Sequence, residues 1–317
     1  MPLFPSSVGL SAISYALPRE RVTVEELEAR GLVESGAVRL RSLGFAHAYL
    51  SDEPAEILAA GAVEQLLKAN DVDPESIQAL FYAGAIPLSH QARGSGGFLD
   101  AFCYPAAKLQ YELGLTHAEV IGVGQAGCLG LIRAIDLARD WLSARPEARR
   151  ALAVSADVLP SGSPREILYN VISDGACAAL VERDAPRNRI LGSRHTTKGY
   201  YWDPEARKAE IIAAYFPTAR HVVLEAIAAA GLVTSDIDHI IPQNVSARSW
   251  EILLDLLDLP RARIYDTNIA AKGHVIAGDP LINLHDAQAE GRLLAGERLI
   301  LFTFGFGANW GCMVLEH

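Results

Sequence analysis

The chain has 317 residues, half of them hydrophobic, and a formal net charge of −10 at pH 7. This length and composition predict one large domain or two closely packed domains with a well-filled core. The net acidity and the lack of any basic cluster argue against nucleic acid as a partner.

Strand and helix patterns alternate through the first half of the chain. The predicted strands there are Val8–Ala16, Ala79–Ala83, Glu119–Val123, Arg150–Ala156 and Ala176–Val181. The predicted helices are Ala55–Ala69, Pro105–Leu113 and a long buried helix after Cys128, with apolar residues at Leu131, Ile135, Ala138 and Leu142. Asn70 and Gly114 are the expected stops of the first two helices.

The second half repeats the alternation. The predicted strands are Ile190–Thr196, Ile237–Ile241, Arg263–Asp266, Arg298–Phe304 and Gly311–Leu315, and the predicted helices are Ala219–Ala230, Ser246–Leu257 and Pro280–Leu294. Such alternation predicts an α/β sandwich with largely buried sheets. The charged stretch Glu182–Asn188 is the best boundary, so we predict an N-terminal half, 1–185, and a C-terminal half, 186–317. Their similar element order suggests an internal duplication, although no sequence repeat is visible.

The four cysteines (Cys103, Cys128, Cys177 and Cys312) are widely spaced and form no C-x-x-C pair. We therefore expect neither a metal site nor a disulfide framework, and a reducing cytoplasm fits this pattern. The first ten residues lack a basic start followed by a long apolar run, so we predict no signal peptide. No apolar run predicts a membrane span.

Cys128 lies between a predicted strand and a predicted helix, in the glycine-rich run Gly124–Ile132. Backbone N–H groups and the positive end of the helix dipole favour a thiolate at such a turn. The flanking glycines let backbone and ligand approach closely. A thiolate there can carry an acyl group as a thioester, which makes Cys128 a candidate nucleophile. The alternative is a buried structural cysteine.

Three motifs resemble a known family. Gly127–Gly130 is similar to the nucleophile elbow of the thiolase superfamily, Ser173–Leu180 to its Gly-Asp-Gly-Ala strand entry, and Phe304–Gly311 to its C-terminal glycine-rich loop. In this order the motifs resemble the ketoacyl-ACP synthase III branch over nearly the whole chain. The resemblance implies a five-layered αβαβα sandwich of two duplicated halves and a homodimer. It also implies acyl-CoA, or the phosphopantetheine of an acyl carrier protein (ACP), as co-substrate, with no permanently bound cofactor.

The departures from that family are informative. Its decarboxylating members carry a Cys-His-Asn set, but the histidine position here holds Gln243 and the asparagine position holds His274. Thiolases use a histidine at the latter position, with an upstream asparagine that Asn268 resembles. They also need a second cysteine, where this chain has Phe304.

These exchanges handicap carbon–carbon bond formation, because the usual enolate stabilisers and the second thiolase base are both missing. Cys128 and the single base His274 suffice for acyl transfer to an oxygen or nitrogen nucleophile. The pattern resembles the ketosynthase-III-like acyltransferases of natural-product pathways, the cervimycin malonyltransferase type, which use a Cys-His-Asp arrangement. We therefore expect an ester- or amide-forming acyltransferase of secondary metabolism, including polyketide pathways, with a small-molecule or peptide acceptor.

The third member of the set would be Asp279, which could fix the tautomer of His274. The alternative is a helix N-cap, since Asp279 directly precedes Pro280. Asn268 and Asn244 are rival orienters of the imidazole.

By resemblance, the oxyanion donors are the backbone N–H groups of Cys128 and Phe306. Gln243 could add an amide donor near the thioester, or only satisfy local backbone. Arg248 could meet the phosphate side of the pantetheine tunnel, or be a surface arginine.

Several alternatives stay open at the level of sequence. His274 could be only a polar loop residue, and His90 and His239, which we interpret as structural, are the next candidate bases. The chain could be a 3-oxoacyl-ACP synthase III-type condensing enzyme, a non-catalytic ketosynthase-like subunit, or a hydrolase of acyl carrier thioesters. The sequence leaves open which acyl chain is carried, which acceptor receives it, and whether CoA or a carrier protein is the donor.

Overall fold

The computed structural model describes residues 7–86, 102–168 and 170–317. The helices are α1 (Val24–Ala29), α2 (Ala37–Ser42), α3 (Ala55–Ala69), α4 (Pro105–Glu112), α5 (Gly130–Ser143), α6 (Lys208–Ala229), α7 (Ala247–Leu257), α8 (Thr267–Lys272) and α9 (Asp279–Ala289). The strands are β1 (Val8–Ala16), β2 (Glu20–Thr23), β3 (His47–Leu50), β4 (Ala79–Ala83), β5 (Glu119–Val123), β6 (Arg150–Asp157), β7 (Glu166–Ile167), β8 (Asn170–Val171), β9 (Gly175–Arg183), β10 (Arg189–Thr197), β11 (His239–Ile241), β12 (Arg298–Gly305) and β13 (Asn309–Glu316).

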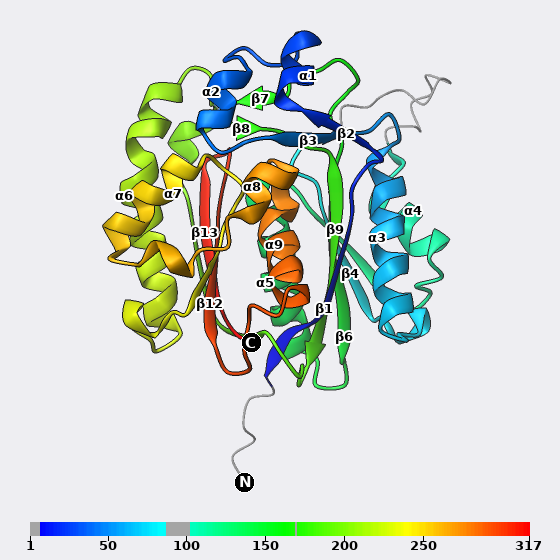
Figure 1. The fold of residues 1–317 in the computed structure, drawn as a ribbon. Coiled ribbons are helices and arrows are strands. Elements are labelled where there is room, and N and C mark those ends of the chain that lie inside the picture. The colour runs from blue at the N-terminus through cyan, green and yellow to red at the C-terminus, as the bar shows by residue number, and fades with distance from the viewer. Residues whose placement is uncertain (1–6, 87–101, 169) are drawn as a thin grey trace.

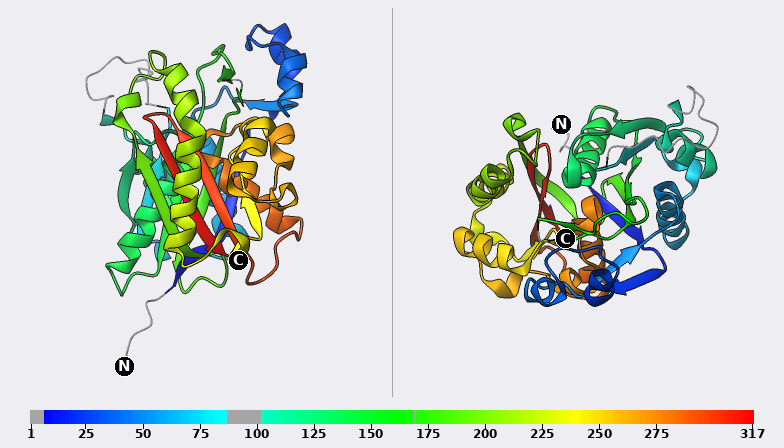
Figure 2. Two further views of the ribbon diagram at one scale, coloured as in Figure 1. Left: turned by 90° about the vertical axis from the view of Figure 1, so that its left-hand side faces the viewer. Right: turned by 90° about the horizontal axis from the view of Figure 1, so that it is seen from above.

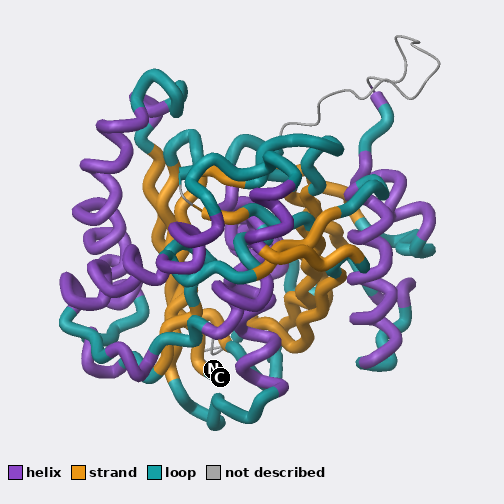
Figure 3. Tube along the Cα trace, turned by 45° about the horizontal axis from the view of Figure 1, so that its top comes forward, coloured by secondary structure: helices purple, strands orange, loops and turns teal. Residues whose placement is uncertain are grey.

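These elements form five layers, α-β-α-β-α (Figure 1). Helices α6 and α7 make one outer layer, α3 and α4 the other, and α5 and α9 lie between the two groups of strands. Figure 2 shows the outer helices on opposite sides of the molecule when it is seen from above, and Figure 3 shows helices between and outside the strands. The predicted five-layered sandwich is confirmed.

The large sheet has the strand order β11-β12-β13-β10-β1-β9-β6-β4-β5. It divides into a five-stranded part (β1, β9, β6, β4 and β5) and a four-stranded part (β10, β13, β12 and β11). A single register pair, Gly9 with Arg189, joins the two parts through β1 and β10. The two parts therefore diverge from one joint, and the middle helices fill the space between them.

The two parts share one topology. In the first part, β1 pairs antiparallel with β9, β9 antiparallel with β6, and β6 parallel with β4. In the second part, β10 pairs antiparallel with β13, β13 antiparallel with β12, and β12 parallel with β11. The fifth position, β5 in the first part, is represented in the second by a lone parallel bridge between Ile240 and Ile264. This shared order is what an internal duplication produces. The boundary at 185/186 stays a prediction.

Most predicted elements are present, with four main differences. Helix α9 ends at Ala289 rather than at the predicted Leu294, since Gly291 has a positive φ of 67° and stops the helix. Helix α6 begins at Lys208 rather than Ala219, because a non-amphipathic stretch with Pro217 still continues the helix. The predicted strand Arg263–Asp266 is wrong: a 3-10 turn, Arg261–Arg263, occupies its start, and only Ile264 pairs with a strand. The short elements α1, α2, α8, β2, β3, β7 and β8 lack a recognisable period and were not predicted.

Helix α6 also bears on the prediction of no membrane span. Among the described residues it is the one helix long and apolar enough to cross a bilayer by length and composition. It packs against β10 and β13, with Val222, Val223 and Ala226 buried in that contact. The apolar composition is therefore accounted for by an outer layer of the sandwich.

The two middle helices, α5 and α9, bury apolar side chains in the core. On α5 the predicted apolar residues Leu131, Ile135, Ala138 and Leu142 are all fully buried. On α9, Leu281, Ile282 and Leu284 are buried as well. At about 25 cal/mol per Å² of apolar surface removed from water, each of these leucine and isoleucine side chains contributes roughly 1.5–3 kcal/mol to folding. This packing holds the N-terminal ends of the two helices in fixed positions.

Candidate active site

The cysteine elbow follows β5 and leads into α5. Gln125 and Gly127 have positive φ values of 60° and 55°, which turn the chain sharply after the strand. Gly127–Leu129 then form a 3-10 turn that runs directly into α5. The predicted strand-to-helix turn is confirmed, and Cys128 is half-buried at the N-terminal end of α5.

The glycine-rich loop after β12 lies against this elbow. A Cβ on Gly305 would be 2.7 Å from the Cys128 nitrogen, and a Cβ on Gly127 would be 2.8 Å from the Phe306 nitrogen. Only glycine permits such an approach. Within the described residues, neither the N–H of Cys128 nor that of Phe306 donates a hydrogen bond to another protein group. Two free N–H groups beside a nucleophile are the parts of an oxyanion hole.

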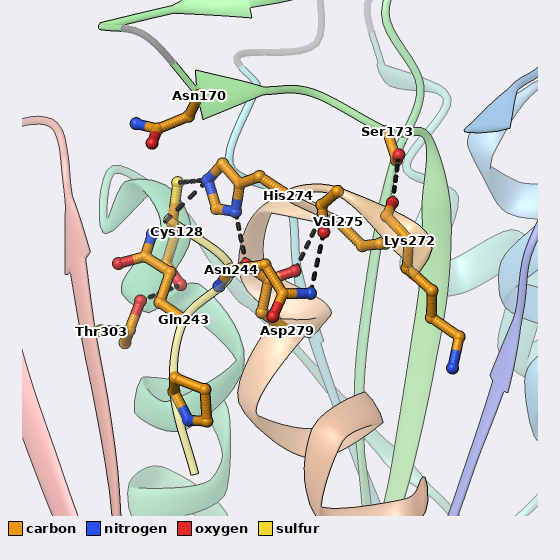
Figure 4. A network of polar contacts seen from close by, with 12 residues as sticks. Cys128, Asn170, Ser173, Gln243, Asn244, Lys272, His274, Val275, Asp279 and Thr303 are labelled. Carbon is orange, nitrogen blue, oxygen red and sulfur yellow. Dashed lines mark hydrogen bonds and ion pairs between the residues drawn. The ribbon is translucent and has the colours of Figure 1, made fainter. Parts of the chain in front are cut away.

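His274 stands over the cysteine sulfur. Its Nε2 lies 3.3 Å from Cys128 Sγ, and its Nδ1 lies 2.5 Å from Asp279 Oδ2 (Figure 4). Its backbone N–H donates to the Val171 carbonyl at 2.7 Å, which ties the loop to β8. The structure thus brings Cys128, His274 and Asp279 into one continuous chain of contacts.

Asp279 is held in the preceding loop and does not cap α9. Its Oδ1 accepts the N–H of Val275 at 2.6 Å, and its Oδ2 accepts the N–H of Asn244 at 2.7 Å (Figure 4). The N-cap position of α9 is Gly278, which makes no side-chain cap bond. The helix-cap alternative is therefore wrong: Asp279 is itself the first helical residue, and its carboxylate turns back to the loop instead of reaching the next N–H groups.

The charges around His274 favour its protonated form. Burial by itself lowers the pKa of the imidazole, but the charges of Asp279 and Cys128 and their hydrogen bonds outweigh burial and raise the pKa to about 10. A protonated imidazole 3.3 Å from the sulfur stabilises a thiolate on Cys128. His274 is therefore poised as an imidazolium at neutral pH, directly beside the Cys128 sulfur.

The Gln243 side chain forms hydrogen bonds with the backbone of Phe304. Its side-chain N–H donates to the Phe304 carbonyl at 2.9 Å, and its Oε1 accepts the Phe304 N–H at 2.8 Å. The same Nε2 lies 3.5 Å from His274 Nε2. One N–H of Gln243 thus satisfies backbone, and the other faces the imidazole. A role toward the thioester stays a prediction.

The two rival asparagines do not contact the imidazole. Asn244 reaches the site through its backbone N–H on Asp279, while its side chain donates to the Gly273 carbonyl at 2.8 Å. The Asn268 side chain donates to Asn283 and Asp286 instead. Neither asparagine orients the His274 ring by direct contact, because Asp279 occupies the Nδ1 side.

Other candidates lie elsewhere. Arg248, on the first turn of α7, is exposed and pairs with Glu251 at 2.7 Å, so a pantetheine contact stays a prediction. His239 binds Glu297 at the far end of β11, and His90 lies outside the described residues. Among the residues that the structure describes, no group of His, Cys, Asp and Glu could hold a metal ion.

One carboxylate near the site was not predicted from sequence. Asp157, at the end of β6, is buried and accepts the N–H groups of Ala85 and Ile86 at 2.8 and 3.0 Å. Burial raises its pKa to about 6, although these bonds and the charge of His274 oppose the shift. A lone Asp at a strand end carries no signal that distinguishes it from a turn residue.

Thr303, within β12, was also not predicted from sequence. Its hydroxyl donates to the Cys128 carbonyl at 3.3 Å.

Comparisons with known proteins agree with this geometry. Residues 124–199 match the family model described as 3-oxoacyl-[acyl-carrier-protein] synthase III, and residues 227–317 match its C-terminal model. The chain is 26% identical to the β-ketoacyl-[acyl-carrier-protein] synthase III of Methylococcus capsulatus, over 95% of this chain and 96% of that one.

Solved structures show the same fold. The 3-oxoacyl-[acyl-carrier-protein] synthase III of Aquifex aeolicus superposes with a TM-score of 0.84 at 22% identity, covering 98% of this chain and 100% of that chain. The protein described as the acyltransferase ChlB3 superposes with a TM-score of 0.85 at 22% identity, covering 98% and 97%. The two family models together span more than half of the sequence, so the chain belongs to the 3-oxoacyl-ACP synthase III-like family of thiolase-fold proteins.

Proposed function

We propose that this chain is an acyltransferase of secondary metabolism. It would move an acyl group from acyl-CoA or acyl-ACP, through a thioester on Cys128, to an oxygen or nitrogen nucleophile. The observation that carries the proposal is the unbroken chain from Cys128 Sγ through the His274 ring to the Asp279 carboxylate. It contains a nucleophile, one base and a carboxylate that orients the base.

The first half-reaction acylates the enzyme. The Cys128 thiolate attacks the thioester carbonyl, and the N–H groups of Cys128 and Phe306 bind the oxyanion that forms. When the tetrahedral intermediate collapses, the carbon–sulfur bond to the pantetheine breaks. His274 gives its proton to the departing thiolate and becomes neutral.

The second half-reaction transfers the acyl group. Neutral His274 accepts the proton of the acceptor hydroxyl or amine as that atom attacks the Cys128 thioester. The carbon–sulfur bond to Cys128 then breaks, which regenerates the thiolate beside an imidazolium. Asp279 stabilises the imidazolium throughout this step.

The two positions at which the resembled families carry their second catalytic group hold Gln243 and Phe304 here. Gln243 cannot titrate, and Phe304 binds it through its own backbone. With Gln243 and Phe304 where condensing relatives have a histidine or cysteine, we infer that an enolate would lack its usual stabilisers. A structural neighbour described as an acyltransferase, ChlB3, is consistent with this inference.

The second candidate is a condensing enzyme, because sequence relatives of this chain are named β-ketoacyl-[acyl-carrier-protein] synthase III. Such an enzyme would use the same thioester on Cys128 but attack it with a carbon nucleophile from a malonyl thioester. The two candidates therefore differ in the second half-reaction and in whether malonyl keeps its carboxylate.

Intact-protein mass spectrometry separates the candidates. The full chain and its Cys128→Ala variant are incubated with a panel of acyl-CoAs that includes malonyl-CoA. We expect an adduct of full acyl mass on the wild type and none on the variant. An adduct of acetyl mass from malonyl-CoA, or β-ketoacyl-ACP formed after a chase with malonyl-ACP, would establish the condensing enzyme instead.

The remaining alternatives give different results in the same experiment. A non-catalytic subunit would show a Cys128 inert to iodoacetamide as well as to every donor. A hydrolase would lose its acyl adduct in buffer at the same rate with and without an alcohol or amine acceptor. Loss of the adduct only when an acceptor is added, together with an ester or amide product, is the outcome that supports transfer.

We expect the enzyme to act in the cytoplasm as a homodimer. The edge strand β5 leads into the cysteine elbow, and its free main-chain groups can pair with a second copy. Light scattering coupled to size exclusion would measure the mass. A monomer that still forms the acyl adduct would contradict this expectation.

A further inference from the structure

Helix α9 carries a polar stripe into the interior of the molecule. Asp279, Asn283 and Asp286 recur at i, i+4 and i+7, so their side chains lie on one face of the helix. Asp279 and Asn283 are completely buried. A polar face in the middle layer of a five-layered sandwich requires hydrogen-bond partners for every group on it.

Both amide hydrogens and the carbonyl oxygen of Asn283 are hydrogen-bonded. Its Nδ2 donates to the Pro242 carbonyl and to Asn244 Oδ1, both at 2.8 Å, and its Oδ1 accepts from Asn268 Nδ2 at 2.9 Å. This one side chain therefore connects three segments: the turn after β11, helix α8 and helix α9.

The contact with Asn244 leads to the reacting groups. With Oδ1 fixed by Asn283, the Asn244 amide donates to the Gly273 carbonyl, next to His274, while its backbone N–H donates to Asp279 Oδ2. Asn244 thus contacts Asp279 through its backbone and the residue before His274 through its side chain, and Asn283 fixes the orientation of that side chain. Figure 4 shows Asn244 between the Asp279 carboxylate and the chain that leads to His274.

At the outer end of the polar stripe, Asp286 binds Asn268 and Lys272, which precede His274 in the chain. Asn268 Nδ2 donates to Asp286 Oδ2 at 2.7 Å, and Lys272 forms an ion pair with Asp286 and donates to Asn268 Oδ1 at 3.1 Å. Lys272 is the last residue of α8 and stands two positions before His274. Although burial raises the pKa of Asp286, hydrogen bonds from His285, Lys272 and Asn268 hold it well below its usual range, so the carboxylate is ionised in the ion pair.

From these contacts we propose that Asn283 is a positioning residue for the His274–Asp279 pair. It acts through Asn244 and touches neither the sulfur nor the imidazole. The inference rests on the Cys128–His274 pair of the proposed function, but its test needs no acyl donor. A failure to find a donor would therefore leave it testable.

The test measures the rate at which iodoacetamide alkylates Cys128 in the full-length chain, from about pH 6 to pH 9. In the wild type we expect a nearly constant rate, because the imidazolium is retained over this range. In Asn283→Ala the Asn244 side chain loses its partner at Oδ1, so its bond to the Gly273 carbonyl, and with it the loop that carries His274, is less firmly fixed. We expect the alkylation rate at the low end of the range to fall by about 10–100-fold and to recover as the pH rises, the equivalent of about one to two pKa units of lost stabilisation.

The groups that face His274 are Cys128, Asp279 and Asp157, and all three are retained in the variant. A merely structural role is excluded with Asn188→Ala. Asn188 is also buried and hydrogen-bonded, to Leu10, Gln288 and His317, but lies away from the site. The Asn188→Ala substitution should lower thermal stability and leave the pH profile of alkylation unchanged.

If Asn283→Ala fails to fold, Asn283→Ser keeps one donor and one acceptor, and we expect a smaller change in the same direction. Wild-type alkylation rates and a flat pH profile in the folded variants would overturn the proposal. So would an identical change of profile in Asn188→Ala.

Discussion

The substitution Asp279→Asn removes the charge of the carboxylate and keeps the volume of the side chain. In the wild type the pKa of His274 is raised from 6.5 to about 10. At 1.36 kcal/mol per pKa unit, this difference corresponds to about 5 kcal/mol in favour of the imidazolium. The charge of Asp279 is the largest contribution that raises the pKa, and without it burial lowers the pKa of the ring.

We therefore expect Asp279→Asn to leave His274 neutral at pH 7 and Cys128 without its counter-charge. Acylation should slow by about 10³-fold or more, or about 4 kcal/mol, which is the scale seen when the carboxylate of a catalytic triad is replaced by an amide. The assay is the rate of acyl-adduct formation by intact mass, measured against pH. The wild-type rate should be flat near neutrality and the variant rate should rise with pH.

The matched control is Asp157→Asn. It makes the same exchange at another buried carboxylate that accepts two backbone N–H groups but makes no hydrogen bond with the imidazole. The reasoning is refuted if Asp279→Asn acylates within about threefold of the wild-type rate with a flat pH profile, or if Asp157→Asn loses as much activity.

Three further predictions concern backbone approach, pH and packing. Gly305→Ala should reduce acylation by more than about 100-fold, since the new Cβ would lie 2.5 Å from the Ala126 carbonyl and displace the oxyanion loop, whereas Gly199→Ala, with open space around it, should match the wild type in the same assay. Asp157 has a pKa of about 6 against an ordinary 3.8, so its contribution to stability is fully present only below pH 3.8 and is lost as the pH rises through 6. Relative to Asp157→Asn, the wild-type free energy of unfolding in urea should fall by about 2 kcal/mol from pH 4 to 7, and parallel curves would contradict this. Ile135→Ala should lower that free energy by about 2–5 kcal/mol, because the side chain is fully buried between the layers, and a change under 1 kcal/mol would mean that the site collapses around the cavity.

Much of the fold could be predicted because its elements have a period. Strands β1, β4 and β5 and helix α3 have the predicted bounds, since each is a long apolar or amphipathic run between turn residues. The elbow at Cys128 was predictable for the same reason: a buried strand, a glycine-rich turn and a helix follow one another along the chain. Short elements at the end of the sheets lack such a period, and their pairing depends on distant partners.

The candidate site was only partly accessible to sequence. Cys128 and His274 could be named from local motifs, but 146 positions separate them, and their 3.3 Å contact exists only because the loop before α9 lies over the elbow after β5. Asp279 showed why local reasoning is insufficient. The pattern Asp-Pro predicts a helix cap, whereas the tertiary fold supplies the Val275 and Asn244 N–H groups and the His274 ring as better partners.

By itself, then, the amino-acid sequence determined the alternation of strands and helices, the buried faces and the candidate nucleophile, because these depend on near neighbours along the chain. The tertiary structure decided which carboxylate meets the imidazole, which N–H groups stay free, and that Asn283 joins three segments. Hydrogen bonds are directional and short-ranged, so their partners are set only when distant segments are packed together.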